Sequence, residues 1–119
     1  MEFSSALKMN YDFRRAYRKG RSAAEPCLVV YARRNNSAAN RVGYTVSNKL
    51  GCAVIRNRVR RRLREIYRLN ERRFRPGYDI VVVARGRSVS AAYGRLERDF
   101  LRAAAALGLL VKEEGKAEP

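Results

Sequence analysis

The chain has 119 residues, and its 27 Lys and Arg against 11 Asp and Glu give a formal net charge of +16. That length fits a single domain, and so strong a positive charge indicates a polyanionic partner, either RNA, DNA or an acidic membrane. The sequence contains no His and only two cysteines, Cys27 and Cys52. A His-based catalytic triad, a His-ligated metal and a tetrahedral zinc site are therefore excluded.

Both cysteines are interpreted as reduced thiols and the protein as cytoplasmic, because a secreted domain of this size usually carries more cysteines. No apolar stretch approaches the roughly 20 residues of a membrane span. Residues 1–13 lack a charged segment followed by an apolar one, so we expect no signal peptide and no membrane partner.

The first 20 residues predict an arm followed by a short helix. We expect residues 1–9 to form a loosely held arm and residues 11–19 to form a helix that Gly20 ends. Phe13 and Tyr17 are four residues apart and share one face of that helix. Their rings fit either of two roles, the core face of the helix or a stacking platform for unpaired bases.

Three to four strands are predicted. Residues 27–34 are rich in β-branched and aromatic side chains, and residues 41–47 alternate between apolar and small or polar ones. The turn-like residues 35–40 between them predict an antiparallel hairpin, with residues 21–24 as a candidate edge strand. The continuous apolar run at residues 79–84 predicts a buried central strand.

Two further helices are predicted. Residues 52–73 form the first, and the Pro76-Gly77 pair follows it as a breaker. Ser88 or Ser90 is expected to cap the second helix and Gly108 to end it. The core stripe of this second helix consists of Leu96, Phe100, Ala103 and Leu107.

The resulting order, α-β-β(-β)-α-β-α, predicts an α+β fold, a small α-β sandwich with helices packed on one sheet. The whole chain, residues 1–119, is interpreted as one domain that binds a polyanion. Its ordered core is expected over about residues 7–110, with flexible tails at residues 1–6 and 112–119.

The most informative segment is residues 56–64, RNRVRRRLR, which has six arginines in nine positions. On a helical wheel, the apolar residues of this segment fall in one arc of about 120° together with the apolar residues just before and after it. Arginines occupy the opposite arc. This amphipathic pattern predicts a helix with one side in the core and one purely cationic side.

An unbroken i, i+4 row of arginines runs along the cationic side, formed by Arg56, Arg60, Arg64 and Arg68. Like charges at this spacing repel one another, and a solvated helix normally relieves the repulsion with acids. Here Glu65 is the only acid between Lys49 and Glu71. Because the arginine fork binds phosphate in a bidentate manner, the row indicates a nucleic-acid surface.

No catalytic constellation that the chain could use alone is evident. Glu97 and Asp99 are two residues apart, so they do not face each other on a helix. The serines have no general base in a known motif, and 11 acids scattered among 27 bases do not suggest the convergent carboxylates of a magnesium nuclease.

Residues 41–64, RVGYTVSNKLGCAVIRNRVRRRLR, followed by Glu65, resemble the signature of the bacterial ribonuclease P protein subunit. The triplet at residues 56–58 is its most specific part. Asp12-Phe13, Tyr17 and Gly20 are similar to that family's first helix, and the resemblance extends over about residues 7–107. Cys52 departs from the family, which more often has Asn or another polar residue there.

The resemblance implies a ribonucleoprotein endonuclease that removes the 5′ leader of precursor tRNA by hydrolysis. The catalytic site, with its Mg²⁺, would belong to the catalytic RNA subunit, and the protein would bind that RNA in a 1:1 complex without being catalytic itself. The family fold also includes a left-handed βαβ crossover, an exception to the usual right-handed rule.

The resemblance assigns two groups of residues. Those expected to contact the RNA subunit are Arg56, Asn57, Arg58, Arg60, Arg61, Arg64 and Arg68. Those expected to line a cleft for the leader, between the first helix and an open sheet face, are Phe13, Tyr17, Tyr31 and Lys49. Aromatic stacking is sequence-tolerant, which suits an enzyme that accepts many leaders.

Three other classes compete with this interpretation. A general RNA-binding or ribosomal protein shares the charge, size and fold class, but it would not assist cleavage. A DNA-binding regulator is disfavoured, because a face made of arginines selects bases poorly. A membrane-surface protein is disfavoured, because the apolar stripe of the arginine helix is needed in the core.

Overall fold

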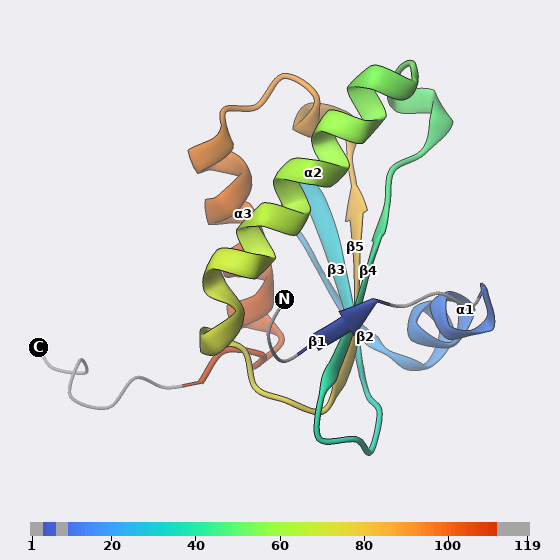
Figure 1. The fold of residues 1–119 in the computed structure, drawn as a ribbon, viewed down its shortest axis with the longest axis vertical. Coiled ribbons are helices and arrows are strands. Elements are labelled where there is room, and N and C mark those ends of the chain that lie inside the picture. The colour runs from blue at the N-terminus through green and yellow to red at the C-terminus, as the bar shows by residue number, and fades with distance from the viewer. Residues whose placement is uncertain (1–3, 7–9, 112–119) are drawn as a thin grey trace, which may run out of the picture.

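A computed structural model describes residues 4–6 and 10–111 (Figure 1). The N-terminal elements are β1 (Ser4–Ala6), α1 (Asn10–Lys19), β2 (Arg21–Ala24), β3 (Leu28–Arg34) and β4 (Asn40–Thr45). A short 3-10 turn, η1 (Asn48–Leu50), then leads into α2 (Ala53–Asn70). The C-terminal elements are η2 (Glu71–Arg73), β5 (Tyr78–Ala84), η3 (Gly86–Ser88) and α3 (Tyr93–Ala106). The α+β class and the predicted order of elements are confirmed.

The five strands form one sheet in the order β1-β4-β5-β3-β2. β5 lies between β3, to which it is antiparallel, and β4, to which it is parallel. The predicted hairpin of residues 27–34 with residues 41–47 is therefore wrong, since β3 and β4 are not neighbours. Ile80, Val81 and Val82 are all buried, and a strand that is apolar on both faces needs a central position.

The parallel pair β4 and β5 is joined through α2. A parallel pair needs a crossover of this kind, because a tight turn cannot return the chain to the same end of the sheet. The connection is a βαβ unit, and its left-handed sense stays a prediction from the family resemblance. It places the arginine-rich helix against β4 and beside α3.

The N-terminal arm was expected to be loosely held, but Ser4–Ala6 form β1 and pair in parallel with β4. Ser4 aligns with Asn40 and Ala6 with Val42. The edge of β4 offers unpaired backbone groups, and a short extended segment can satisfy them. The rest of the predicted arm and the C-terminal tail from residue 112 lie outside the described residues.

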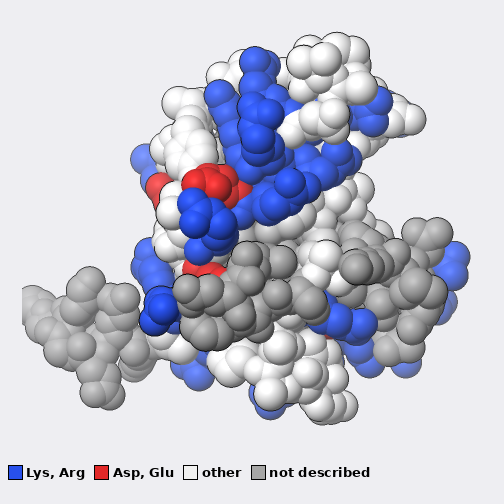
Figure 2. Space-filling view, viewed as in Figure 1, with Lys and Arg blue, Asp and Glu red and all other residues white. Residues whose placement is uncertain are grey.

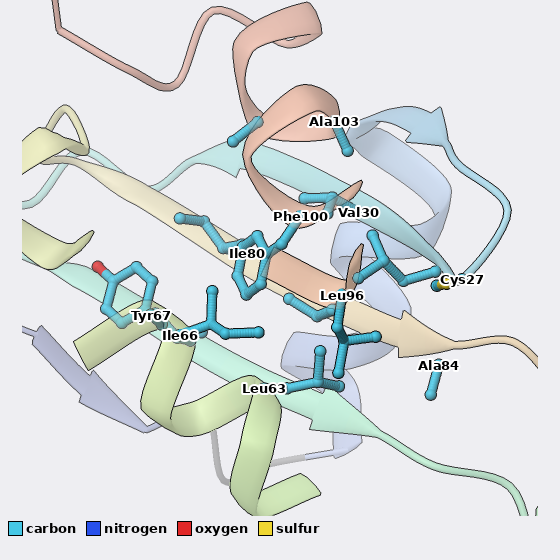
Figure 3. Packing of buried hydrophobic residues seen from close by; sticks show 14 of the residues in the cluster. Cys27, Val30, Leu63, Ile66, Tyr67, Ile80, Ala84, Leu96, Phe100 and Ala103 are labelled. Carbon is cyan, nitrogen blue, oxygen red and sulfur yellow. The ribbon is translucent and has the colours of Figure 1, made fainter. Parts of the chain in front are cut away.

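The helices cover the two faces of the sheet unequally (Figure 1). α2 and α3 lie against one face, and α1 lies alone on the other. Alternate strand residues such as Leu28, Val30 and Ile80 point into the layer beneath α2 and α3. There they meet Leu63, Ile66, Tyr67, Leu96, Phe100 and Ala103 in one continuous core (Figure 3).

The C-terminal helix follows its predicted stripe, because Leu96, Phe100, Ala103 and Leu107 are all buried. Gly108 ends it in the left-handed conformation, with φ of 74°. The Gly108 and Leu109 N–H groups donate to the carbonyls of Ala105 and Ala104 at 3.0 and 2.9 Å, which is the Schellman pattern of a helix end.

The predicted serine cap of this helix is wrong. The residue before α3 is Ala92, which has no side-chain cap. Ser88 ends η3 instead and is buried, and Ser90 is exposed in the turn that follows. The loop after β5 is longer than the pattern indicated, because η3 occupies its first residues.

Asp99 joins α3 to the start of β3. Its carboxylate accepts the backbone N–H of Cys27 at 3.0 Å and pairs with Arg95 at 3.2 Å. Burial alone would raise the pKa of Asp99, but the bonds from Cys27 and the charge of Arg95 outweigh it and lower that pKa. Burial and the Asp99 carboxylate together raise the pKa of the Cys27 thiol.

Candidate nucleic-acid interface

The outward side of α2 carries the arginines that the helical wheel places there. Its inward side buries Val59, Leu63, Ile66 and Tyr67. Figure 2 shows Lys and Arg side chains gathered along the course of α2. We call the residues expected to contact RNA the cationic face. Arg56 and Arg60 are partly buried and the other members are exposed, and the full set is Arg56, Asn57, Arg58, Arg60, Arg61, Arg64 and Arg68.

The arginines of the cationic face differ in what their guanidinium groups contact. Arg58, Arg61 and Arg64 are exposed and have no hydrogen bond or ion pair to any residue that the structure describes. Arg60 donates to Oδ1 of Asn57 at 3.1 Å. Arg56 is partly buried, and its Nε donates to the carbonyl of Gly51 at 3.1 Å.

Arg68 differs from the others, because Glu65 occupies its fork. Nε and one terminal nitrogen of Arg68 donate to the two oxygens of Glu65, at 3.0 and 2.6 Å. The hydrogen bond from Arg68 lowers the pKa of Glu65, and the same pair raises the pKa of Arg68. The pair stays exposed, with 52% and 43% of the two side chains accessible.

Arg62 belongs to the same run of sequence but lies on a different side of the helix. It donates to the carbonyl of Ala91 at 3.2 Å and so connects α2 to the turn before α3. The helical wheel correctly leaves it out of the cationic face.

The second predicted site is the sheet face beneath α1, which we call the open face. Strand register aligns Thr45 with Val83 and Val29 in one row across the sheet, and Gly43 with Val81 and Tyr31 in the next. Val81 is buried with Ala16 of α1, whereas Tyr31 and Val83 are only partly buried.

Two of the predicted aromatic residues meet over the open face. The rings of Tyr17 and Tyr31 pack edge to face with centroids 4.9 Å apart, a favourable aromatic geometry. Tyr17 remains 38% exposed. Its hydroxyl lies 3.1 Å from the hydroxyl of Thr45. The side chain of Phe13 lies outside the described part of the chain.

Gly20 sets how closely α1 approaches the sheet. A Cβ atom at this position would lie 2.5 Å from the carbonyl oxygen of Ala16 and 2.6 Å from that of Ala32. Gly20 therefore ends α1 as predicted, and its lack of a side chain lets the helix end pack directly on β3. This contact positions Tyr17 over Tyr31.

Lys49 lies in η1, between β4 and α2. The hydroxyl of Ser47 accepts the Lys49 backbone N–H at 3.1 Å and so holds the turn. The Lys49 side chain is exposed and makes no hydrogen bond or ion pair with the residues that the structure describes. It therefore projects from the segment that connects the open face to the start of the cationic face.

Thr45 is the residue of this face that sequence analysis missed. Its place opposite Val42, Tyr44 and Val46 in the strand alternation was visible in the sequence. What the pattern did not indicate is that its hydroxyl meets Tyr17, because that contact depends on where α1 crosses the sheet.

None of the helices described is long and apolar enough to cross a membrane. Within residues 4–6 and 10–111, no group of three or more His, Cys, Asp or Glu side chains is placed to hold a metal ion. Cys27 is a buried free thiol and Cys52 an exposed one.

The fold and the two faces define a class of protein: a small basic α+β domain with one sheet face buried under a cationic helix and the other left partly open. A family model described as Ribonuclease P matches residues 1–108, and the chain belongs to this family. The family name implies tRNA processing by a ribonucleoprotein of which this chain is the protein component.

Individual relatives agree with this assignment. The chain is 44% identical over 101 residues to the ribonuclease P protein component of Alkaliphilus metalliredigens, covering 85% of this chain and 91% of that protein. It is 46% identical to that of Alkaliphilus oremlandii, with 85% and 89% covered.

Two solved structures share the fold. The RNase P protein of Staphylococcus aureus superposes with a TM-score of 0.82 at 31% identity, covering 89% of this chain and 97% of that one. The protein from Thermotoga maritima superposes with a TM-score of 0.76 at 30% identity, covering 82% and 92%.

Proposed function

We propose that this protein binds the catalytic RNA subunit of ribonuclease P through the cationic face of α2. The observation that carries the proposal is the set of exposed guanidinium groups on Arg58, Arg61 and Arg64, which have no acceptor among the described residues. Buried or paired arginines would have structural roles, but unpaired forks in a row are suited to phosphate oxygens.

The 5′ leader of precursor tRNA would bind over the open face. Tyr17 and Tyr31 offer ring surface there, and base stacking on such rings tolerates any sequence. Lys49, between the two faces, would meet a leader phosphate. The protein would thus hold the leader while the RNA subunit holds the tRNA body, so that precursor binds better than product.

Catalysis in this proposal belongs to the RNA subunit, which would bind the Mg²⁺ ions that the hydrolysis needs. The protein would act in a 1:1 complex by lowering the repulsion between two RNA molecules and by anchoring the leader. Its place of work would be the cytoplasm, where a bacterial cell makes precursor tRNA.

The decisive experiment is Mg²⁺-dependent cleavage of a precursor tRNA by a bacterial ribonuclease P RNA, with and without this protein. We expect the protein to lower the Mg²⁺ concentration at which the leader is removed. If the protein binds its cognate RNA tightly but leaves the Mg²⁺ requirement unchanged, the protein is a general RNA-binding domain.

The leader site is tested by comparing precursor with mature tRNA. Tyr17→Ala and Tyr31→Ala should each weaken binding of precursor about tenfold, because a stacked base contributes ~1–3 kcal/mol. Binding of mature tRNA should not change. As a control, Arg98→Ala removes an exposed charge from α3 and should leave the precursor preference intact. Equal losses for both RNAs would overturn the leader assignment.

A further inference from the structure

The row of arginines along α2 is not chemically uniform. Along the middle of the helix, the guanidinium groups of Arg58, Arg61 and Arg64 are free of bonds to the described residues. At the end of the helix, both sides of the Arg68 fork are bonded to Glu65, at 3.0 and 2.6 Å. A phosphate could bind Arg68 in a bidentate manner only after displacing this carboxylate.

Acidic side chains gather at this end of α2 and are sparse elsewhere on it. Glu65 is the only acid within α2. Glu97 of α3 lies beside the helix end, where it accepts a bond from Asn70 at 3.1 Å. After burial, the charges of Glu97 and Glu65 both raise the pKa of Tyr93. Figure 2 shows acidic side chains bordering the blue band along α2.

We propose that Glu65 ends the RNA-binding surface of α2. The surface would include Arg58, Arg60, Arg61 and Arg64 and would stop before Arg68. Glu65 would act in two ways, by occupying the Arg68 fork and by repelling any phosphate that advances beyond Arg64. This inference rests on the proposed function and adds to it the limit of the RNA footprint and the residue that sets it.

The physical basis is repulsion against a misplaced partner. An arginine row of uniform charge lets a phosphate backbone slide by one helical turn, since Arg56, Arg60, Arg64 and Arg68 repeat every four residues. A carboxylate at one end of the row disfavours binding of the RNA backbone in the shifted register, and so favours the unshifted register over it. Glu65 is therefore a specificity-determining residue, and Arg68 is its partner and not an RNA contact.

The test measures binding of ribonuclease P RNA to the full chain as a function of salt concentration. Each phosphate contact removed should flatten the slope of log affinity against log salt by ~0.7–0.9. Arg61→Ala should flatten it by this amount, and Arg68→Ala should leave it unchanged. Glu65→Gln should steepen it by one contact, and the double variant Glu65→Gln, Arg68→Ala should return it to the wild-type value.

Two outcomes overturn the inference. One is that Arg68→Ala flattens the slope as much as Arg61→Ala does, which would make Arg68 an ordinary phosphate contact. The other is that Glu65→Gln leaves the slope unchanged. If Arg61→Ala also has no effect, the proposed function of the cationic face fails, and the inference fails with it.

Folding does not obscure this test. The side chains of Arg68 and Glu65 are 52% and 43% exposed, and an exposed pair of this kind contributes little to stability. Thermal unfolding of each variant serves as the control, and the three single variants and the double variant should unfold together with the wild type.

Discussion

The two faces of the sheet are formed by the same strands but are covered very differently. Beneath α2 and α3, alternate residues of β3, β4 and β5 join one continuous core that includes Tyr67 and Phe100. Beneath α1, the described residues form only a small apolar cluster, in which Ala16 and Val81 are buried and Tyr31 and Val83 pack partly against them. The fold thus concentrates its apolar burial on one face and leaves aromatic and hydroxyl groups accessible on the other.

Under the proposed function, this difference separates stability and recognition into two layers of the molecule. The covered face can be varied little without unfolding the chain, because close-packed interiors respond to the loss of a few methylene groups. The open face has fewer buried contacts to lose, so its residues can serve a ligand. The following predictions test this division, beginning with the largest expected effect.

Phe100→Ala should be the most destabilising change. Phe100 is buried and packs edge to face on Phe74 with ring centroids 6.0 Å apart. Its loss leaves a cavity and should cost about 3–5 kcal/mol of unfolding free energy. Val83→Ala, on the open face, should cost roughly 1 kcal/mol. Urea unfolding of both variants measures the contrast, and equal costs would contradict the division between the faces.

Gly20→Ala should come next, because the added methyl group clashes with the carbonyl oxygens of Ala16 and Ala32. We expect a loss of about 1–3 kcal/mol. Hydrogen exchange should show faster opening in α1 than in α3. The matched control is Gly94→Ala in α3, where a Cβ meets nothing within 4 Å, so that the variant should gain up to about 1 kcal/mol. A neutral Gly20→Ala variant would mean that α1 is not held by this close approach.

Asp99→Asn should destabilise the protein by about 1–2 kcal/mol at neutral pH, because it removes a charged acceptor from Cys27 and Arg95. The pKa of Asp99 is lowered in the folded state, so its contribution is present above the ordinary value of 3.8. That contribution is lost as the pH falls through the folded value.

The measurement for Asp99 is unfolding free energy against pH for wild type and variant. The two curves should differ by a constant amount near neutral pH and converge in acid below pH 3.8. Curves that stay parallel down to the acid limit would show that the ionised carboxylate does not stabilise this junction.

Tyr17→Phe should have the smallest effect. It removes only the contact with the Thr45 hydroxyl at 3.1 Å, which is exposed. The unfolding free energy should change by less than about 0.5 kcal/mol, as for most surface substitutions. Because the ring remains, the preference for precursor over mature tRNA should also remain in a binding assay. A large loss of that preference would move the leader contact from the ring to the hydroxyl.

The elements with a long, regular pattern were predicted well from the sequence. The stripe of α3 and the two sides of α2 follow from helical spacing repeated over several turns, and burial of Leu63 or Phe100 depends on little else. The central position of β5 also followed from its apolar run. In each case the spacing of apolar residues along the element shows whether one face or both faces are apolar.

Strand pairing could not be predicted in the same way. Residues 35–40 have the composition of a hairpin turn, and a local pattern does not show that a later strand separates the two segments. The parallel pairing of β1 with β4 was missed for a related reason, since Ser4–Ala6 carry no strong strand signal. In both cases the pairing of strands is decided by contacts between residues far apart in the chain.

The candidate site likewise has features that local spacing predicts and features that depend on long-range contacts. Most of the cationic face could be predicted from the wheel, whereas Arg56 and Arg58 were assigned to it by the family resemblance. The Glu65–Arg68 pair could have been predicted from its i, i+3 spacing. The contact of Tyr17 with Tyr31 could not, because it requires α1 to cross β3 at a distance that Gly20 permits. The roles of these residues in binding RNA remain predictions.

The place of β5 in the sheet also has a consequence during synthesis. Leu28 must wait for Ala84, and Arg41 for Asp79, before β3 and β4 are joined by the strand that lies between them. The sheet therefore acquires its middle strand late, and such non-local pairing slows folding. The arginine-rich segment precedes β5 in the chain, so it leaves the ribosome before the sheet beneath it is complete. A nascent chain of this protein thus exposes its most cationic part to cellular polyanions while its apolar side still lacks a core.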